Sequence, residues 1–299
     1  MKRSRYFVLI SLLALLAMPA QAQQQLPNRA PPSNDGVQGI GGMSGARKLV
    51  GADQVEQAGT QQYSQMKRDA AAKRTLAPDN HPEVQRLRKI AQRIIPQASR
   101  WNERAKNWQW EVNLFISPEL NAFCMPGGKI AFYSGILDKL KLTDDEVAMI
   151  MGHEMAHALR EHGRERMGKQ MATQGALALG SALLGLGDLG RTAVNMGGQL
   201  LSLTFSREDE SEADLLGLDL AARSGFDPRA GVTLWQKMAQ ANRGAPPQWL
   251  SSHPTGKNRI AQISKHLPEV MPLYARSQNK TLQQLGPFQT NWREIPPVN

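Results

Sequence analysis

The stretch GHEMAHALREHG, residues 152–163, holds three of the chain's six histidines and a glutamate directly after the first of them. On a helix, residues four apart lie on the same face, so His153 and His157 can direct one ring nitrogen each to a single point. Glu154, one position further on, is close enough to hold a water molecule on a metal bound there. The HExxH pattern therefore predicts a metal site on a helix.

The helix itself is predicted by its first turn. Thr143 and Glu146 have the spacing of a capping box, so we expect the helix to begin at about residue 144 and to run through the histidines. An ordinary charged helix is the alternative interpretation. Composition alone would produce HExxH in only about one sequence in a few hundred, which favours the metal site.

His162 does not extend this motif. A third histidine ligand on the same segment would need a glycine at 160 and a histidine at 163, where the chain has Arg160 and Gly163. We therefore expect His162 to be a surface residue.

A second acidic segment offers the missing ligand, since a catalytic zinc usually has three protein ligands and one water. In ESEAD, residues 210–214, Glu210 and Asp214 are four apart and share a helix face. One of them can bind the metal while the other hydrogen-bonds a ligand histidine, and the spacing does not say which. Glu208 and Glu212 point elsewhere, so we expect them to be solvated or in salt bridges.

The N-terminal segment predicts export. MKRSRYFVLISLLALLAMPAQA, residues 1–22, has a basic start, an apolar run over 6–18 and small residues up to Ala22, which is the layout of a cleaved signal peptide. An N-terminal membrane anchor is the alternative, but the run is shorter than the ~20 residues of a bilayer span. No cysteine follows Ala22 directly, which excludes a lipid anchor there.

Composition and charge indicate a globular protein. Apolar residues make up 41% of the chain, and loss of the signal peptide lowers the formal net charge from +10 to +7. We find no nucleic-acid-binding motif and expect no such partner, so the basic residues are assigned to solvated helix faces. Cys124 is the only cysteine, which excludes an internal disulfide and indicates a small buried residue.

The pattern along the chain predicts an α+β fold, mainly α, with a small β-sheet beside the HExxH helix. We expect a flexible lead-in at 23–50, one domain at 51–270, and a C-terminal tail at 271–299 that packs on the domain or extends from it. The predicted helices cover 52–74, 82–99, 192–224 and 228–242, and the predicted extended segments cover 108–117 and 122–137, the latter with a turn at 126–128.

An uncharged stretch of small and apolar residues covers 170–187. A transmembrane hairpin is one interpretation, but the small residues and the length argue against it. We favour a mobile or groove-covering helix, with at most peripheral membrane contact.

HExxH followed by ExxAD resembles the zinc metallopeptidases of family forty-eight, which include HtpX, the CaaX prenyl-protein endoproteases and the exported Oma-like, BepA-like and LoiP-like proteases. Segments 121–137 and 251–260 match the family as well, and the resemblance covers about 82–268. It implies a gluzincin-type zincin domain with one zinc per chain. It also implies that Glu210 is the third ligand after His153 and His157, and that Asp214 supports the site without binding the metal.

The resemblance also implies roles near the zinc for His253 and Arg259. Either could stabilise the oxyanion of the reaction while Glu154 acts as general base. A helix-starting His-Pro turn and a surface arginine are the alternatives. A further alternative makes His253 a fourth ligand that closes the water position and leaves the enzyme inactive at rest.

Substrate is expected to bind as an extended strand along an edge within 122–134, with Ala131, Phe132 and Tyr133 as contact residues. A simple hairpin turn is the alternative.

The resemblance implies a zinc metalloendopeptidase of the cell envelope, most readily the periplasm, that acts on unfolded or misassembled envelope proteins. Two rivals remain open: a chaperone-like outer-membrane assembly factor with latent proteolysis, which would contact the assembly machinery, and a membrane-inserted protease that uses 170–187.

Overall fold

The computed structural model describes residues 35–183, 196–241, 248–253 and 258–292. The segment expected to be a signal peptide, 1–22, lies outside these residues, as does the end of the 170–187 stretch. Among the described helices, none has both the length and the apolar character that crossing a membrane requires.

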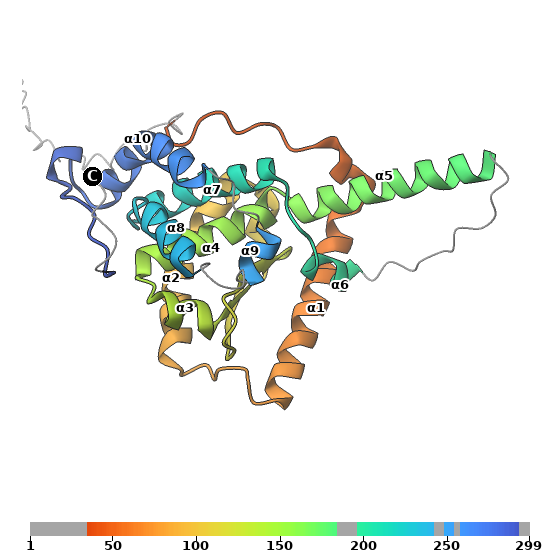
Figure 1. Cartoon of the computed structure of the whole chain (residues 1–299), viewed down its shortest axis with the longest axis horizontal. Helices are drawn as coiled ribbons and strands as arrows, with labels where there is room; N and C mark the ends of the chain where they lie inside the picture. The colour runs from red at the N-terminus through yellow and green to blue at the C-terminus, as the bar shows by residue number, and fades with distance from the viewer. Residues whose placement is uncertain (1–34, 184–195, 242–247, 254–257, 293–299) are drawn as a thin grey trace, which may run out of the picture. The chain divides into compact units, whose positions relative to one another are not determined.

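The HExxH helix, α4 (Asp144–Leu159), is buried along nearly its whole length. It begins at the predicted residue, because Thr143 accepts a hydrogen bond from the Glu146 amide and the Glu146 carboxylate accepts one from the Thr143 amide. Figure 1 shows α4 between other helices, and it contacts α2, α7 and α8 as well as strand β2. A helix packed on several sides holds its side chains firmly, which suits a site that needs fixed geometry.

Helix α7 (Arg207–Arg223) packs against α4 at a pair of glycines. A Cβ atom on Gly217 would lie 3.0 Å from the backbone nitrogen of His153, and a Cβ atom on Gly152 would lie 3.0 Å from the Gly217 carbonyl oxygen. The two backbones therefore meet so closely that a Cβ atom at either position would force them apart by a few tenths of an ångström. Since Glu210 lies two helical turns before Gly217 on the same face, this contact brings Glu210 towards α4.

The continuous helix predicted over 192–224 is wrong in its described part. The chain forms α6 (Met196–Leu201) and, after a break, α7. The reason is a second capping box, in which the Ser206 side chain accepts from the Asp209 amide and starts a new helix.

The sheet has three strands in the order β1-β3-β2, with β1 (Glu111–Phe115), β2 (Ala122–Met125) and β3 (Lys129–Tyr133). Strand β3 pairs parallel with β1 and antiparallel with β2. The turn between β2 and β3 contains Gly127 and Gly128, whose φ values of +86° and +79° favour glycine. Within the described residues β2 has no strand on its other side, and it lies against α4.

The predicted class, α+β and mainly helical with a small sheet beside the HExxH helix, is confirmed. The other helices are η1 (Gly45–Leu49), α1 (Ala52–Ala72), α2 (Pro82–Ile94), η2 (Ile95–Arg100), η3 (Glu103–Asn107), α3 (Ser134–Leu140), α5 (His162–Leu183), α8 (Ala230–Ala241), α9 (Gln248–Ser252), α10 (Arg259–Ser277) and η4 (Leu282–Gln284).

The described part of the expected lead-in, residues 35–50, contacts the domain instead of standing free of it. Val37 and Val50 are buried, and Arg223 donates a hydrogen bond to the Asp35 carbonyl. At the other end, α10 runs without a break through the boundary expected at 270. The domain packing therefore extends beyond the expected 51–270 on both sides.

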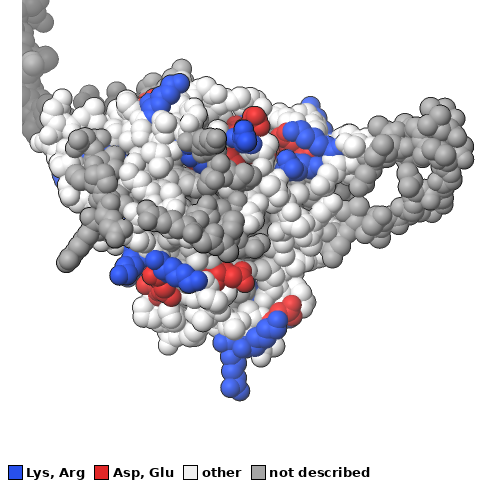
Figure 2. Space-filling model, in the orientation of Figure 1, with Lys and Arg blue, Asp and Glu red and all other residues white. Residues whose placement is uncertain are grey.

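A buried ion pair anchors the start of α4. Lys237 on α8 and Glu146 are both fully buried, and the Lys237 ammonium donates to Glu146 Oε2 at 2.6 Å, to Asn291 Oδ1 at 2.6 Å and to the Lys141 carbonyl at 3.2 Å. All three ammonium protons thus have an acceptor, as burial requires. On the surface shown in Figure 2, basic and acidic side chains lie beside one another.

Candidate metal centre

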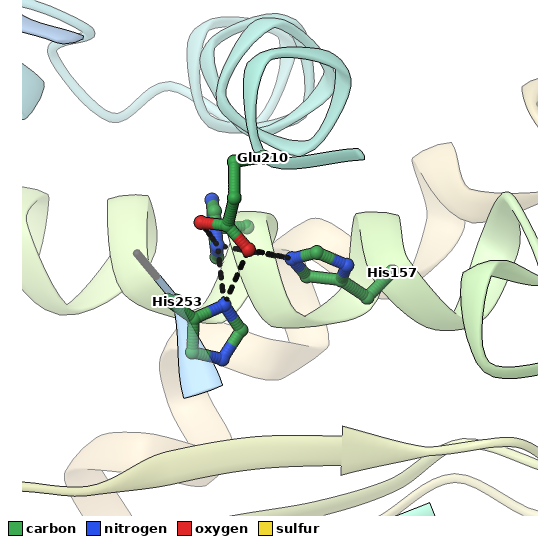
Figure 3. Close-up of side chains that lie close together, drawn as sticks. His157, Glu210 and His253 are labelled. Atoms are coloured by element: carbon green, nitrogen blue, oxygen red, sulfur yellow. Dashed lines mark hydrogen bonds and ion pairs between the residues drawn. The ribbon is translucent and has the colours of Figure 1, made fainter. Parts of the chain in front are cut away.

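Four buried side chains from three segments converge between α4, α7 and α9. His153 and His157 come from α4, Glu210 from α7, and His253 directly follows α9; one ligand atom from each lies within 4.8 Å of all the others. Figure 3 shows Glu210 extending from α7 towards the imidazoles of His157 and His253. Three imidazoles and one carboxylate are a donor set that suits zinc and several other transition metals.

The separations between these donor atoms fit a single small cation. Glu210 Oε1 lies 2.9 Å from His253 Nδ1 and 3.4 Å from His157 Nε2, while His153 Nε2 lies 3.1 Å from His157 Nε2 and 3.3 Å from His253 Nδ1. Ligand atoms around a tetrahedral zinc with bonds of about 2.0–2.1 Å are separated by roughly 3.3 Å. Four of the six separations are therefore close to those around a tetrahedral metal ion, and all six are within 4.8 Å.

Electrostatics favour the ligand form of His157 and of Glu210. Burial lowers the pKa of His157 well below its usual value, which keeps the imidazole neutral. Burial alone would raise the pKa of Glu210, but hydrogen bonds with His157 and His253 outweigh it and lower the pKa, so the carboxylate stays ionised. A neutral imidazole and a carboxylate are the forms that bind a metal.

Asp214 and Arg259 lie directly behind the donor atoms. Asp214 Oδ1 is 3.0 Å from His153 Nδ1, so it supports the ring from the side away from the cluster. The Arg259 guanidinium donates to Asp214 Oδ2 at 2.7 Å and to Glu210 Oε2 at 2.6 Å. The structure thus places Glu210 among the donors and Asp214 behind His153, a distinction that spacing alone left open.

Glu154 lies beside the cluster with its carboxylate buried. The Trp249 indole donates to Glu154 Oε1 at 2.6 Å, and His253 Nε2 lies 3.5 Å from the same oxygen. Trp249 was not identified from the sequence as a residue of the site. Its position four residues before His253 puts the two on one helix face, and that spacing is the signal that could have found it.

The expectation that His162 is a surface residue is wrong. His162 is buried, and its Nδ1 lies 2.9 Å from His157 Nδ1. The reason is a turn after α4 in which Glu161 adopts a φ of +58°, so that His162 begins α5 close to the end of α4. Glu212 is in a salt bridge with Arg160, one of the two environments expected for it.

A cavity of about 280 Å³ lies against the cluster. It is lined by Glu154, His157, the strand β2 and a set of mostly apolar side chains. These side chains are Met66, Tyr133, Leu200, Leu201, Leu203 and Phe205. Burial raises the pKa of the Cys124 thiol on β2, which keeps the thiol protonated.

The assignment of Ala131 and Phe132 to a substrate-binding edge is wrong. Both residues are fully buried on β3, which is paired on both sides and so has no edge to offer. Tyr133, at the end of β3, does line the cavity. Among the described strands, β1 and β2 are at the edges of the sheet, and β2 is the edge strand that lines the cavity. Local sequence could not show this, because the central strand β3 pairs in parallel with β1, which precedes β2 in the chain.

Comparison with known proteins extends this picture. Residues 82–267 match the sequence profile of peptidase family M48. The chain is 32% identical over 223 residues to the mitochondrial metalloendopeptidase OMA1 of Schizosaccharomyces pombe, covering 74% of this chain and 63% of that protein.

Two Escherichia coli proteins are also similar. The metalloprotease LoiP is 29% identical over 194 residues, covering 64% of this chain and 73% of LoiP. The beta-barrel assembly-enhancing protease is 29% identical over 174 residues, covering 55% of this chain and 36% of that protein. This chain spans less than two thirds of the OMA1 proteins of S. pombe, Arabidopsis thaliana and Saccharomyces cerevisiae.

Proposed function

The chain belongs to peptidase family M48, and from this premise we propose that it is a zinc-dependent endopeptidase with His153, His157 and Glu210 as metal ligands. The observation that carries the proposal is the convergence of four buried donor atoms at distances that suit one cation. Bound zinc would supply a polarised scissile carbonyl and a water with lowered pKa.

Glu154 acts as the general base in this proposal. Its carboxylate is buried beside the donor atoms, where it takes a proton from the attacking water and passes it to the leaving amine. Arg259 holds Glu210 and Asp214 in place through charged hydrogen bonds, which fixes the third ligand and the support of His153.

The test is Glu154→Gln, with Glu208→Gln as the matched control because Glu208 is an exposed glutamate on α7. We expect Glu154→Gln to retain zinc, measured by elemental analysis, and to lose casein hydrolysis. Glu208→Gln should resemble the wild type in both. Unchanged turnover in zinc-loaded Glu154→Gln would refute the assigned base.

We propose that substrate pairs with the free edge of β2 and places an apolar side chain in the adjacent cavity. Pairing with a strand edge needs an extended backbone, which unfolded proteins offer and compact ones do not. The apolar lining from α6 and Phe205 favours bulky apolar side chains at that subsite. A peptide series that varies one position between Leu, Phe and Asp tests this, and equal cleavage of all three would contradict it.

His253 has two candidate roles, to stabilise the oxyanion or to bind the metal as a fourth ligand. Its position favours the fourth-ligand role in the resting enzyme. Its Nδ1 lies within hydrogen-bonding distance of Glu210 Oε1, inside the donor cluster, where it would take the place of a water. This supports latent proteolysis, which is one part of the second candidate function, an outer-membrane assembly factor. We expect His253→Ala to keep its zinc and to cleave casein faster, whereas the half-buried His266→Ala should leave cleavage unchanged.

We also propose export to the periplasm and action on unfolded or misassembled envelope proteins, with outer-membrane assembly machinery as a partner. The N-terminal sequence pattern and the similarity to LoiP and the beta-barrel assembly-enhancing protease of E. coli support this. Mass spectrometry of the protein produced in a bacterium should find a chain that begins at Gln23. A chain that keeps residues 1–22 would contradict the cleaved leader.

A further inference from the structure

We propose that His162 and Glu212 are positioning residues that hold the metal ligand His157 in its binding orientation. This inference rests on the proposed metal centre. His162 Nδ1 lies 2.9 Å from His157 Nδ1, and His162 Nε2 lies 2.9 Å from Glu212 Oε2. Glu212 is held in turn by Arg160, whose Nη2 lies 2.6 Å from Glu212 Oε1.

With a cation bound at His157 Nε2, only one placement of protons satisfies the contacts along this chain. His157 Nε2 faces the donor cluster and must be free of a proton to bind a cation, so the proton of the ring is on Nδ1. His157 Nδ1–H then donates to His162 Nδ1, which must be the acceptor. The His162 proton is therefore on Nε2 and donates to the Glu212 carboxylate.

The arrangement repeats, with one extra ring, the support of the other ligand histidine. His153 Nδ1 contacts Asp214, and Asp214 is bound by Arg259. In both hydrogen-bond chains a ligand histidine is connected to a carboxylate, and an arginine binds that carboxylate. Such outer partners fix the ring and raise its basicity as a ligand. The extra ring of His162 links His157 to a carboxylate that it does not contact directly in the structure.

The backbone after α4 is shaped for this contact. On an uninterrupted helix, a residue five positions after His157 would point well away from it. Glu161 instead adopts a φ of +58°, a conformation that is uncommon for a residue other than glycine. Asn102 donates to the carbonyl of Leu159, the last residue of α4, and so fixes the point where the turn begins.

His162 is only 1% exposed, so its two ring nitrogens need partners inside the protein. A purely structural role, in which the pair with Glu212 ties α5 to α7, is the alternative. The two readings differ in the metal affinity that they predict. Loss of an outer partner of a ligand histidine lowers metal affinity about 10–100-fold, whereas loss of a structural bond lowers stability alone.

The experiment compares His162→Leu with His162→Asn in the full chain. Asn places an amide oxygen near the position of Nδ1 and keeps the acceptor for His157, whereas Leu removes it. Zinc affinity would be measured by competition with a chromophoric chelator, and the melting temperature of the metal-free protein would be measured separately. We expect His162→Leu to bind zinc ~10–100-fold more weakly and His162→Asn to stay within a few-fold of the wild type.

A second measurement needs no variant. In zinc-loaded wild-type protein, correlation of imidazole ¹⁵N and ring ¹H resonances reports the tautomer of each histidine. We expect the Nε2–H tautomer for His162 and the Nδ1–H tautomer for His157. A His162 ring with its proton on Nδ1 would overturn the inference even if His162→Leu failed to fold.

The possible failures can be told apart. Equal zinc affinity in wild type and His162→Leu, with a lower melting temperature for the variant, overturns the positioning role and leaves the metal centre intact. Wild-type protein that binds no zinc, cobalt or manganese overturns the metal centre, and the inference with it.

Discussion

Gly217→Ala tests whether the glycine contact between α4 and α7 positions the third ligand. The added Cβ would lie 3.0 Å from the His153 nitrogen and 3.3 Å from the Gly152 carbonyl carbon, where ordinary contact is 3.4–4 Å. Both atoms belong to the backbone of a buried helix, so they cannot swing aside. The two helices must therefore separate by roughly 0.4 Å at this point, the difference between 3.0 and 3.4 Å.

The expected effects on stability and on activity differ. Overpacking of this kind costs about 1–3 kcal/mol, and alanine in place of glycine inside a helix returns about 1 kcal/mol. The net loss is then roughly 0–2 kcal/mol, which lowers the melting temperature by at most about 8 °C in a domain of this size. A misplacement of about 1 Å can cost 100-fold in rate, so 0.4 Å corresponds to a loss of about 6-fold in kcat/KM.

The assay is kcat/KM on a fluorogenic peptide, with zinc affinity and melting temperature measured in parallel. Gly231→Ala on α8 is the matched control, because its added Cβ would meet the flexible end of the Met149 side chain at 3.2 Å. We expect the control to stay within about 2-fold of the wild type, since a side-chain terminus can move aside. A folded Gly217→Ala protein with unchanged kcat/KM and zinc affinity would refute the claim that this contact places Glu210.

Three further predictions address the fold, the cavity and the metal. Lys237→Met leaves the fully buried Glu146 carboxylate without its cation. It should lower the free energy of unfolding, measured in urea, by about 3–5 kcal/mol, and the variant should keep its zinc stoichiometry. A loss below about 1 kcal/mol would contradict the buried pair. Leu201→Asp places a charge in the cavity lining and should raise KM for peptides with bulky apolar residues, whereas Leu282→Asp, also exposed but outside the lining, should not. Treatment with 1,10-phenanthroline should abolish casein cleavage and added zinc should restore it, whereas cleavage that persists after verified metal loss would exclude a metallopeptidase.

The part of the site that a single helix carries could be predicted from spacing. The positions of His153, Glu154 and His157 follow from the helical repeat, and the first turn of α4 follows from its capping box. Glu210 and Asp214 share one face, so spacing alone could not rank them. The distinction depends on how far along α7 the glycine contact with α4 lies.

Other features depend on contacts that no local pattern records. The burial of His162 depends on a left-handed backbone conformation at Glu161, a residue type that gives no signal for it. The central place of β3 depends on its parallel pairing with β1, from which it is separated by β2 in the chain. Local alternation in 122–137 predicted the two extended segments that form β2 and β3, but it was wrong for 134–137, which begin α3, and it could not say which segment forms the edge.

The three acceptors around the Lys237 ammonium show that residues outside the homologous stretch contribute to the packing of the domain. Asn291, one of them, lies beyond residues 82–267, the stretch recognised by homology, and the end of that stretch falls inside α10. A polypeptide trimmed to the homologous stretch would cut a helix and deprive a buried cation of an acceptor, which costs about 1–3 kcal/mol for one lost bond. Recombination or engineering that treats the homologous stretch as a self-sufficient module would therefore divide one compact unit.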